Sequence, residues 1–233
     1  MSAPERTRAR RTRLLSPAAL ARDYAAVLLD LDGTLVDSGE SIERAWRSWC
    51  LAYDVDPAEL DGLLHGRTAT DLIGLVRPTW SPKEIGESAR HQLRVQETDP
   101  RPGTAIPGAA ELLAALQDAG PWAVVTACTP LLARHRLTSS GLPLPPSLVS
   151  AHDTTRGKPD PEPYLVAAER LGVDPADCLV VEDAPAGVRS ARAAGCTVAA
   201  VTTTHPAHDL HEADTVIDDL RHLVLTASAP AGT

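Results

Sequence analysis

Two acidic residues, Asp30 and Asp32, lie where an apolar run ends and a turn begins. The run covers residues 25–29, and Gly33 follows the second acid. Such a run is typical of a buried strand, so Asp30 is expected at the end of a core strand. An Asp-Gly pair can form a hairpin turn, but a hairpin gives no reason for a second acid, and an unpaired buried carboxylate is expensive. The pair therefore indicates catalysis or metal binding.

Further polar residues follow later apolar runs or lie in the loops beyond them. They are Thr126, Lys158, Glu182 and Asp183. This set suits phosphoryl transfer, because a carboxylate can attack a phosphate only after a metal ion, a lysine and hydrogen-bond donors neutralise the phosphate charge. Carboxylate oxygens from Asp30, Asp183 and Glu182 are ligands of the kind that Mg²⁺ prefers. The residue types therefore predict a Mg²⁺-assisted reaction at a phosphate.

Each of these residues also has a purely structural interpretation. Thr126 could cap a helix, and Glu182 and Asp183 could cap the helix that follows them. Lys158 could be a surface lysine. However, Lys83 and Lys158 are the only lysines among 22 Lys and Arg residues, so position 158 keeps a compact ammonium where the chain otherwise uses guanidinium. That selectivity favours a functional lysine.

Strand-like and helical patterns alternate along most of the chain. The apolar runs that indicate strands cover residues 25–29, 122–126, 148–149, 178–181, 197–201 and 215–217. Helical patterns that end at Gly or start at Pro separate these runs. Such alternation predicts an α/β fold, with a Rossmann-like parallel sheet, helices on both faces and ligands at the carboxyl ends of the strands.

A stretch of helical pattern interrupts this alternation directly after the first strand. Ile42, Ala45, Trp46 and Trp49 follow the spacing of an amphipathic helix. Shorter helical stretches are expected around 57–64, 68–76 and 82–97, before a Pro- and Gly-rich linker at 99–103. The predicted division is a flexible basic N-terminal tail at 1–22, an α/β core at 23–37 and 104–233, and an inserted helical cap at 38–103.

The composition argues against several classes of partner. A formal net charge of −9 over 233 residues disfavours nucleic acid or an anionic membrane surface as the main partner. No apolar stretch approaches the ~20 residues that a transmembrane helix needs. Arg10-Arg11 could suggest an export signal, but the apolar stretch after it is short and contains Pro17, so a solvated tail is favoured. The scattered cysteines lack a Cys-x-x-Cys pair. We therefore expect a cytoplasmic protein, taken as a monomer.

Four segments give the chain a resemblance to a known family. Residues 29–38, 124–126, 157–161 and 181–188 resemble the four motifs of the haloacid-dehalogenase-like superfamily, in order and at similar spacing. The resemblance covers residues 24–220. Within the superfamily the chain is most similar to phosphatases of small sugar and polyol phosphates that carry a helical cap, a group related to β-phosphoglucomutase.

The resemblance implies a role for each motif residue. Asp30 would be the nucleophile and Asp32 the acid/base. Phosphate and substrate contacts would come from Thr126, Lys158, Gly33, Thr34 and Ala127. Mg²⁺ would be held by Asp30, the carbonyl of Asp32 and Asp183, with Glu182 nearby. One departure is visible, because Ala127-Cys128 follows Thr126 where the family usually has Ser-Gly or Ser-Ala.

Asp32 limits which reactions of this superfamily fit the sequence. A dehalogenase of this superfamily lacks an acid two residues after the nucleophile, whereas expelling an alkoxide from phosphorus requires a proton donor. Phosphonate hydrolysis needs a cap lysine, and the candidate, Lys83, lies in a Ser-Pro-Lys-Glu segment that looks like a solvated helix start. His205, His208 and His211 are three apart, but they lack the i, i+4 pairing that would support a zinc site. Of the reactions considered, phosphoryl transfer is therefore the one that the residues support.

The cap should choose the substrate. His65, Gly66 and Arg67 join two short helices, and similar loops in the sugar phosphatases face the active site; the structural alternative is an ordinary turn before a helix capped by Thr68. The leading hypothesis is a Mg²⁺-dependent phosphatase of a small sugar or polyol phosphate. The alternatives are a β-phosphoglucomutase-type mutase, which the sequence cannot separate from it, and a non-catalytic sugar-phosphate sensor.

Overall fold

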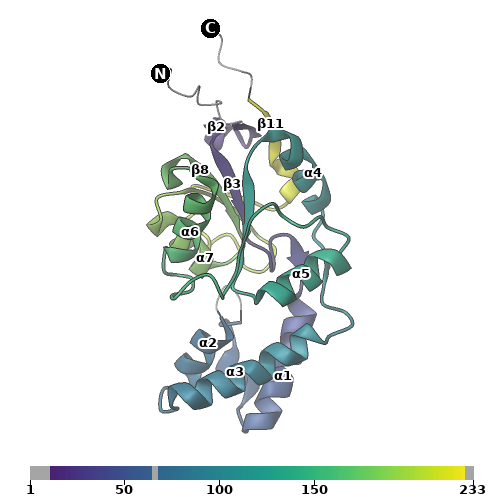
Figure 1. The fold of residues 1–233 in the computed structure, drawn as a ribbon, viewed down its shortest axis with the longest axis vertical. Helices are drawn as coiled ribbons and strands as arrows, with labels where there is room; N and C mark the ends of the chain where they lie inside the picture. Colours follow the sequence, from purple (N-terminus) through teal and green to yellow (C-terminus); the bar gives the residue numbers. More distant parts are fainter. Residues whose placement is uncertain (1–10, 65–67, 229–233) are drawn as a thin grey trace, which may run out of the picture.

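The computed structural model describes residues 11–64 and 68–228, and its centre is a six-stranded parallel sheet (Figure 1). The strand order is β10 (Thr215–Ile217), β9 (Thr197–Val201), β8 (Cys178–Glu182), β3 (Ala26–Leu29), β6 (Trp122–Val125) and β7 (Leu148–Val149). Every neighbouring pair is parallel. Strand β3 lies between β6 and β8, so the residues that follow these three strands emerge next to one another.

Helices cover both faces of this sheet (Figure 1). Helices α4 (Ala109–Ala119) and α5 (Pro130–Ser139) pack on one face, and α6 (Glu162–Leu171) and α7 (Pro185–Ala193) pack on the other. Both faces of the central strands are buried, which explains why their sequences are continuous apolar runs. The predicted α/β fold with a Rossmann-like parallel sheet is confirmed.

The inserted segment forms a helical body with its own apolar core. It contains α1 (Gly39–Tyr53), the short 3₁₀ helix η2 (Pro57–Leu60), α2 (Ala69–Val76) and α3 (Pro82–Glu97). The helix expected over 57–64 is therefore only a 3₁₀ turn. Strand β4 (Val36–Asp37) leads into this body and β5 (Thr104–Ala105) returns from it, and the two pair antiparallel. The two connections thus lie side by side below the sheet (Figure 1).

The N-terminal segment differs from the expected flexible tail. Strand β1 (Thr12–Ser16) pairs with β2 (Asp23–Tyr24) and with β11 (Val224–Ala227) in a second, antiparallel sheet. A 3₁₀ helix, η1 (Ala18–Leu20), lies between β1 and β2. Leu14 is 1% exposed because it packs into the core. The tail prediction was wrong for residues 12–22. One partner of β1, strand β2, follows shortly after it, but the other, β11, lies near the opposite end of the chain, and no local pattern reveals that pairing.

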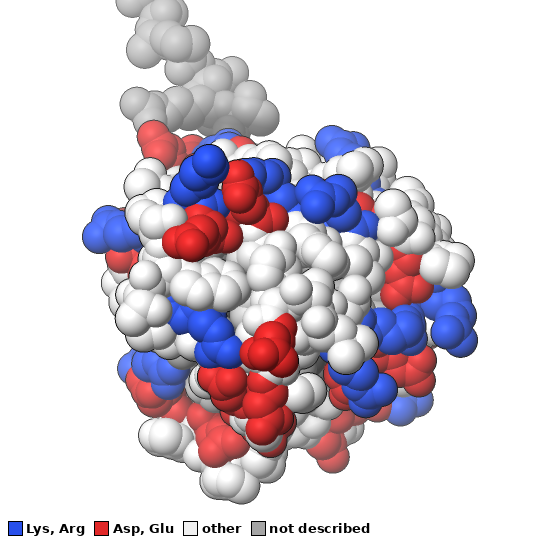
Figure 2. Space-filling model, turned by 90° about the horizontal axis from the view of Figure 1, so that it is seen from below, with Lys and Arg blue, Asp and Glu red and all other residues white. Residues whose placement is uncertain are grey.

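The remaining elements are two short 3₁₀ helices, η3 (Pro175–Asp177) and η4 (Leu220–His222). Over the part of the chain that is described, no helix has the length and apolarity to cross a membrane. All four cysteines are free thiols. On the cap end of the molecule, Figure 2 shows basic and acidic side chains interspersed rather than gathered into a basic patch.

Candidate active site

The carboxyl ends of the three central strands bring the first, second and fourth motifs together. Asp30 follows β3, Thr126 follows β6, and Glu182 and Asp183 lie at the end of β8. The backbone N–H of Asp30 donates to the carbonyl of Val181 at 3.0 Å, which continues the pairing of β3 with β8. Asp30, Glu182 and Asp183 are all buried. The parallel sheet thus places these carboxylates at one point.

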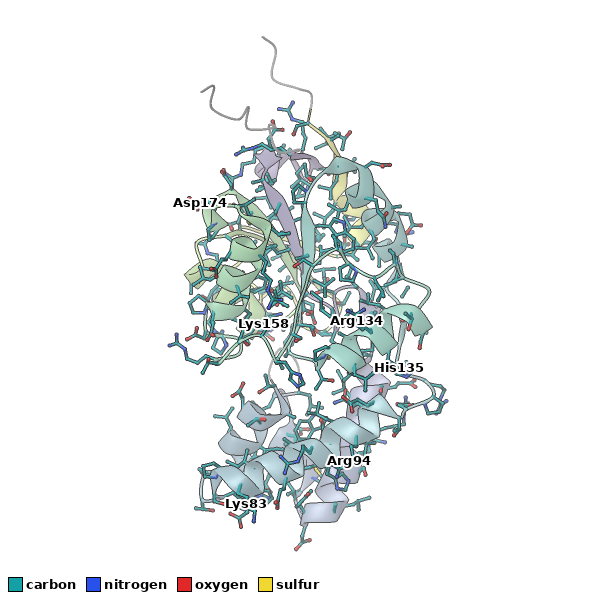
Figure 3. The ribbon with its side chains drawn as sticks, viewed as in Figure 1. Lys83, Arg94, Arg134, His135, Lys158 and Asp174 are labelled. Atoms are coloured by element: carbon teal, nitrogen blue, oxygen red, sulfur yellow. The ribbon has the colours of Figure 1, made fainter. Side chains whose placement is uncertain are left out.

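Lys158 enters the same site from the loop before α6. Its ammonium donates to Asp30 Oδ1 at 2.6 Å, to Glu182 Oε1 at 2.6 Å and to the carbonyl of Val125 at 3.1 Å. The residue is 3% exposed, so it is not a surface lysine. An ammonium has three hydrogens, and these three acceptors use all of them. Lys83, by contrast, lies at the far end of the cap (Figure 3).

Burial and mutual repulsion shift the ionisation of the carboxylates. Burial raises the pKa of Asp30 to about 7, although the charge of Lys158 opposes the shift. The pKa of Asp183 is raised well above its usual value by burial and then by the charges of Asp30 and Glu182. The pKa of Lys158 moves up: burial lowers it, but the two carboxylates outweigh that effect. Lys158 is therefore cationic.

The site has the charge and donor set of a divalent cation site. Among the described residues, Asp30, Glu182 and Asp183 each offer a carboxylate oxygen, and these oxygens lie within 4.8 Å of one another. Three buried carboxylates face one ammonium, which leaves a negative excess that a divalent cation would balance. Oxygen-only ligands suit a hard cation such as Mg²⁺. The histidines at 205, 208 and 211 do not belong to this group.

Glu182 is held by donors on both oxygens. Besides Lys158, Oε1 accepts from the hydroxyl of Tyr164 at 2.7 Å, and Oε2 accepts from the backbone N–H groups of Asp183 at 3.0 Å and Ala184 at 3.3 Å. Gly187 packs against this carboxylate so closely that a Cβ there would lie 1.7 Å from Oε1. Glu182 therefore fixes the position of Lys158.

Gly33 and Thr34 pack against Asp183. The hydroxyl of Thr34 donates to Asp183 Oδ1 at 3.3 Å, and that of Thr204 donates to Oδ2. Gly33 has φ +88°, and a Cβ there would lie 2.1 Å from Asp183 Oδ2. Glycine is thus required for both the backbone conformation and the close approach. The hydroxyls of Thr34 and Thr204 thus orient the carboxylate of Asp183.

Thr126 has a structural role in the turn after β6. Its hydroxyl accepts from the backbone N–H of Cys128 at 3.1 Å, and its own N–H donates to the carbonyl of Val149 at 2.9 Å. Thr126 and Ala127 also line the pocket above Asp30. Thr126 therefore stabilises this turn and lines the site but does not cap a helix, since the N-cap of α5 is Thr129.

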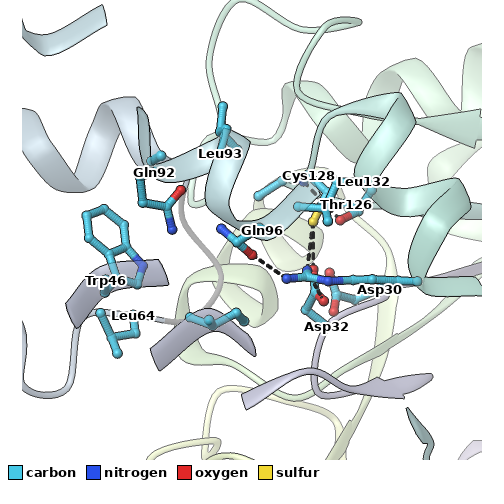
Figure 4. Close-up of a pocket in the computed structure, with 14 residues that line it drawn as sticks. Asp30, Asp32, Trp46, Leu64, Gln92, Leu93, Gln96, Thr126, Cys128 and Leu132 are labelled. Carbon is cyan, nitrogen blue, oxygen red and sulfur yellow. Dashed lines mark hydrogen bonds and ion pairs between the residues drawn. The ribbon is translucent and has the colours of Figure 1, made fainter. Parts of the chain in front are cut away.

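Asp32 is surrounded by residues that the sequence did not single out. Its Oδ1 accepts from the hydroxyl of Ser38 at 2.6 Å and from the guanidinium of Arg136. Its Oδ2 accepts from the thiol of Cys128 at 2.8 Å (Figure 4). Arg136 is 1% exposed and also donates to the side chain of Gln96 on the cap helix α3. No sequence signal identified Arg136, because a basic residue in a helix is normally solvated.

The pocket lies between core and cap. Asp30, Asp32, Thr126 and Arg136 line it from the core, and α1 and α3 line it from the cap, with Trp46 and Gln92 among their residues (Figure 4). The predicted substrate contacts His65, Gly66 and Arg67 lie outside the described residues. The arrangement offers a buried carboxylate beside an ammonium, a second carboxylate two residues further on, and a covered space for a small ligand.

Comparisons with known proteins agree with this chemistry. The family described as haloacid dehalogenase-like hydrolase matches residues 24–195. The chain is 41% identical over 200 residues to hexitol phosphatase A of Escherichia coli (strain K12). The alignment covers 85% of this chain and 93% of that protein. It is 36% identical over 207 residues to validoxylamine A 7'-phosphate phosphatase of Streptomyces hygroscopicus subsp. limoneus, which covers 84% of this chain and 94% of that protein.

A solved structure extends the likeness to the fold. The structure of β-phosphoglucomutase from Clostridium difficile matches with a TM-score of 0.74, over 86% of this chain and 93% of that one. Its sequence identity is 21%, so the match shows a shared fold alone.

Proposed function

Because this chain belongs to the haloacid dehalogenase-like hydrolases, we propose that it hydrolyses the phosphate monoester of a small sugar or polyol. The observation that carries the proposal is the buried Asp30 carboxylate, 2.6 Å from the Lys158 ammonium, at the floor of a pocket that the cap covers. The relatives are named as phosphatases of small phosphorylated molecules, which supports the same substrate class.

The proposed reaction has two steps at phosphorus. In the first, Asp30 attacks phosphorus and forms an aspartyl phosphate, the bond from phosphorus to the ester oxygen breaks, and Asp32 donates a proton to the leaving alcohol. In the second, Asp32 removes a proton from the attacking water, which cleaves the aspartyl phosphate to phosphate and free Asp30. Lys158 orients Asp30 and offsets negative charge throughout.

A bound Mg²⁺ would supply the remaining positive charge at the phosphate. We propose that Asp30, Asp183 and the carbonyl of Asp32 hold it, and that Glu182 lies beside it and positions Lys158. The negative excess of the buried carboxylates supports this proposal. The loop of His65, Gly66 and Arg67 is proposed, on the family resemblance, to contact the sugar or polyol end of the substrate.

Phosphate release is favoured over mutase chemistry. The relatives that share 41% and 36% identity are named as phosphatases, whereas the likeness to the β-phosphoglucomutase of Clostridium difficile, at 21% identity, shows the fold alone. A mutase would interconvert hexose 1- and 6-phosphates without releasing phosphate. The two activities are thus separated by the product that is measured.

The test is a panel of phosphomonoesters assayed for released phosphate with purified protein. The panel contains hexitol phosphates, glycerol phosphate, hexose phosphates and p-nitrophenyl phosphate. We expect the highest kcat/KM on a polyol or sugar phosphate, loss of turnover in EDTA and recovery with added Mg²⁺. Asp30→Asn should be folded and inactive. No turnover on any member would refute the proposal and favour a binding protein.

A further inference from the structure

Three polar side chains extend the pocket away from the Asp30 carboxylate. Gln92 and Gln96 lie one turn apart on α3, so both face the core, and Arg136 of α5 lies opposite them. Gln92 is 1% exposed and Gln96 is 6% exposed. Figure 4 shows the carboxamide of Gln92 pointing into the space between Trp46 and Gln96. Because these carboxamides are buried, they do not serve to keep the surface of the cap in contact with water.

Two atoms of this group are buried without a hydrogen-bond partner. They are Oε1 of Gln92 and Nε of Arg136. An unpaired buried polar atom is costly in free energy, so native structures pair such atoms with protein, water or ligand. Both residues line the pocket, and a ligand hydroxyl can both donate to Gln92 Oε1 and accept from a guanidinium N–H. The unpaired atoms therefore point to a ligand with hydroxyl groups.

The charges of this part of the pocket, which we call the subsite (Gln92, Gln96 and Arg136), disfavour a second anionic group besides the phosphate at Asp30. The guanidinium of Arg136 is paired with the carboxylate of Asp32, so its charge is already matched. The carboxamides of Gln92 and Gln96 are neutral. Among the described lining residues there is no other Lys or Arg to receive a second phosphate or a carboxylate. A neutral group with several hydroxyls fits this set better than a bisphosphate.

The walls of the subsite are apolar. Trp46, Leu64 and Leu93 line it beside the polar groups. A polyol chain presents C–H groups as well as hydroxyls, so it can pack its carbon backbone on these walls while its oxygens bind the polar row. This pairing of surfaces distinguishes a polyol from a purely apolar alcohol.

We propose that Gln92, Gln96 and Arg136 form the subsite that binds the hydroxyls of the leaving alcohol, and that they select neutral, polyhydroxylated alcohols. Gln92 contributes specificity alone, because its side chain makes no hydrogen bond to Asp32. Gln96 and Arg136 bind substrate and also orient Asp32. The inference rests on the proposed phosphatase function and adds the residues that recognise its substrate.

The test compares Gln92→Met with the wild type on two substrates in the presence of Mg²⁺. Methionine keeps the length of the side chain and removes its acceptor. For a hexitol phosphate we expect KM to rise about tenfold with kcat changed less than twofold, the loss of roughly one buried hydrogen bond. For p-nitrophenyl phosphate, which has no hydroxyls to bind, kcat/KM should stay within about twofold.

Controls separate recognition from folding. Glu87→Met, at an exposed position of the same helix, should leave both substrates unchanged. If Gln92→Met loses its melting transition, Gln92→Asn replaces it, and the same KM effect is expected because the shorter amide no longer reaches. An equal loss on both substrates, or an unchanged hexitol phosphate KM, overturns the subsite. A wild type that cleaves only p-nitrophenyl phosphate overturns the proposed function as well.

Discussion

The Asp32 carboxylate is held by three side chains from three places in the chain. Ser38 precedes α1, Cys128 follows β6 and Arg136 lies on α5. Ser38 sits at the N-terminus of α1 without capping it, since its hydroxyl goes to Asp32 instead. The side chain is thus fixed in place rather than free to rotate, which suits a group that must deliver a proton to one atom of the substrate.

Asp32→Asn should separate acid catalysis from nucleophilic attack. Because the asparagine cannot donate the proton, kcat/KM on a polyol phosphate, which reports the first step, is expected to fall at least 100-fold, within the usual range for general acid catalysis. p-Nitrophenolate leaves without protonation, so kcat/KM on its ester should fall far less, although kcat falls on both esters because Asp32 also activates the water of the second step. Stopped assays of both esters give the ratio. Equal losses of kcat/KM would contradict the acid role.

Lys158→Arg should be nearly as inactive as Lys158→Ala. The ammonium makes three hydrogen bonds in a site where the residue is 3% exposed, so a planar guanidinium has neither the space nor the matching acceptors. We expect kcat to fall at least 100-fold in both variants. Near-complete activity in the arginine variant would show that positive charge alone is sufficient.

At the scale of elements, helix α7 supports the site through one glycine. Gly187 allows the helix to approach the end of β8, where Glu182 holds Lys158. Within the cap, α3 begins with a complete capping box at Ser81 and Glu84, which fixes where this helix starts. The close approach at Gly187 therefore helps to set the position of Lys158, which lies on another element.

Gly187→Ala tests this support against a matched glycine in another helix. A Cβ at 187 would lie 1.7 Å from Glu182 Oε1, so the carboxylate must move and kcat should fall more than tenfold. Gly74→Ala in α2 is the control. The nearest atom to its Cβ would be Ile85 Cδ1 at 3.9 Å, so we expect unchanged kcat and up to about 1 kcal/mol of added stability. Similar kcat values for both variants would refute the steric argument.

At the scale of the whole molecule, contacts distant in sequence hold the edges of the fold. Strand β11 pairs with β1 and so ties both ends of the described chain together. On another edge, Arg170 of α6 reaches the carbonyl of Leu148 at 2.8 Å and the carboxylate of Asp153. These interactions join helices, strands and loops that are distant in the sequence, so no local sequence pattern predicts them.

The Asp153 pair predicts a pH-dependent part of the stability. Burial raises the pKa of Asp153, but hydrogen bonds from Arg170 and Ser150 outweigh it and lower the value from 3.8 to about 2. The stabilisation is therefore present above about pH 4 and is lost as the pH falls through about 2. Asp153→Asn should lower the free energy of unfolding at pH 7 by up to about 2 kcal/mol. Solvent screening of this partly exposed ion pair makes the loss smaller than that limit.

Urea unfolding of the wild type and of this variant at several pH values measures the effect. The difference in unfolding free energy should shrink as the pH falls from 4 towards 2, because the protonated aspartic acid resembles asparagine. A difference that stays constant over this range would show that Asp153 acts without its charge.

The sequence by itself determined the α/β core and the identity of the acidic and basic groups. The apolar runs before Asp30, Thr126 and Glu182 are long and buried on both faces, so local hydrophobicity specifies them as strands. Parallel strands carry their carboxyl ends to one edge, so the convergence of these motifs also follows from pattern alone.

Only the tertiary structure decided the surroundings of Asp32 and the fate of the N-terminal segment. Arg136 and Gln96 look like solvated residues in the sequence, and their burial depends on how α3 packs against α5. Strand β1 likewise depends on β11, more than two hundred residues away. A hydrophobic period reports which face of an element is buried but not what packs against it, so contacts between distant elements become visible only once the chain is folded.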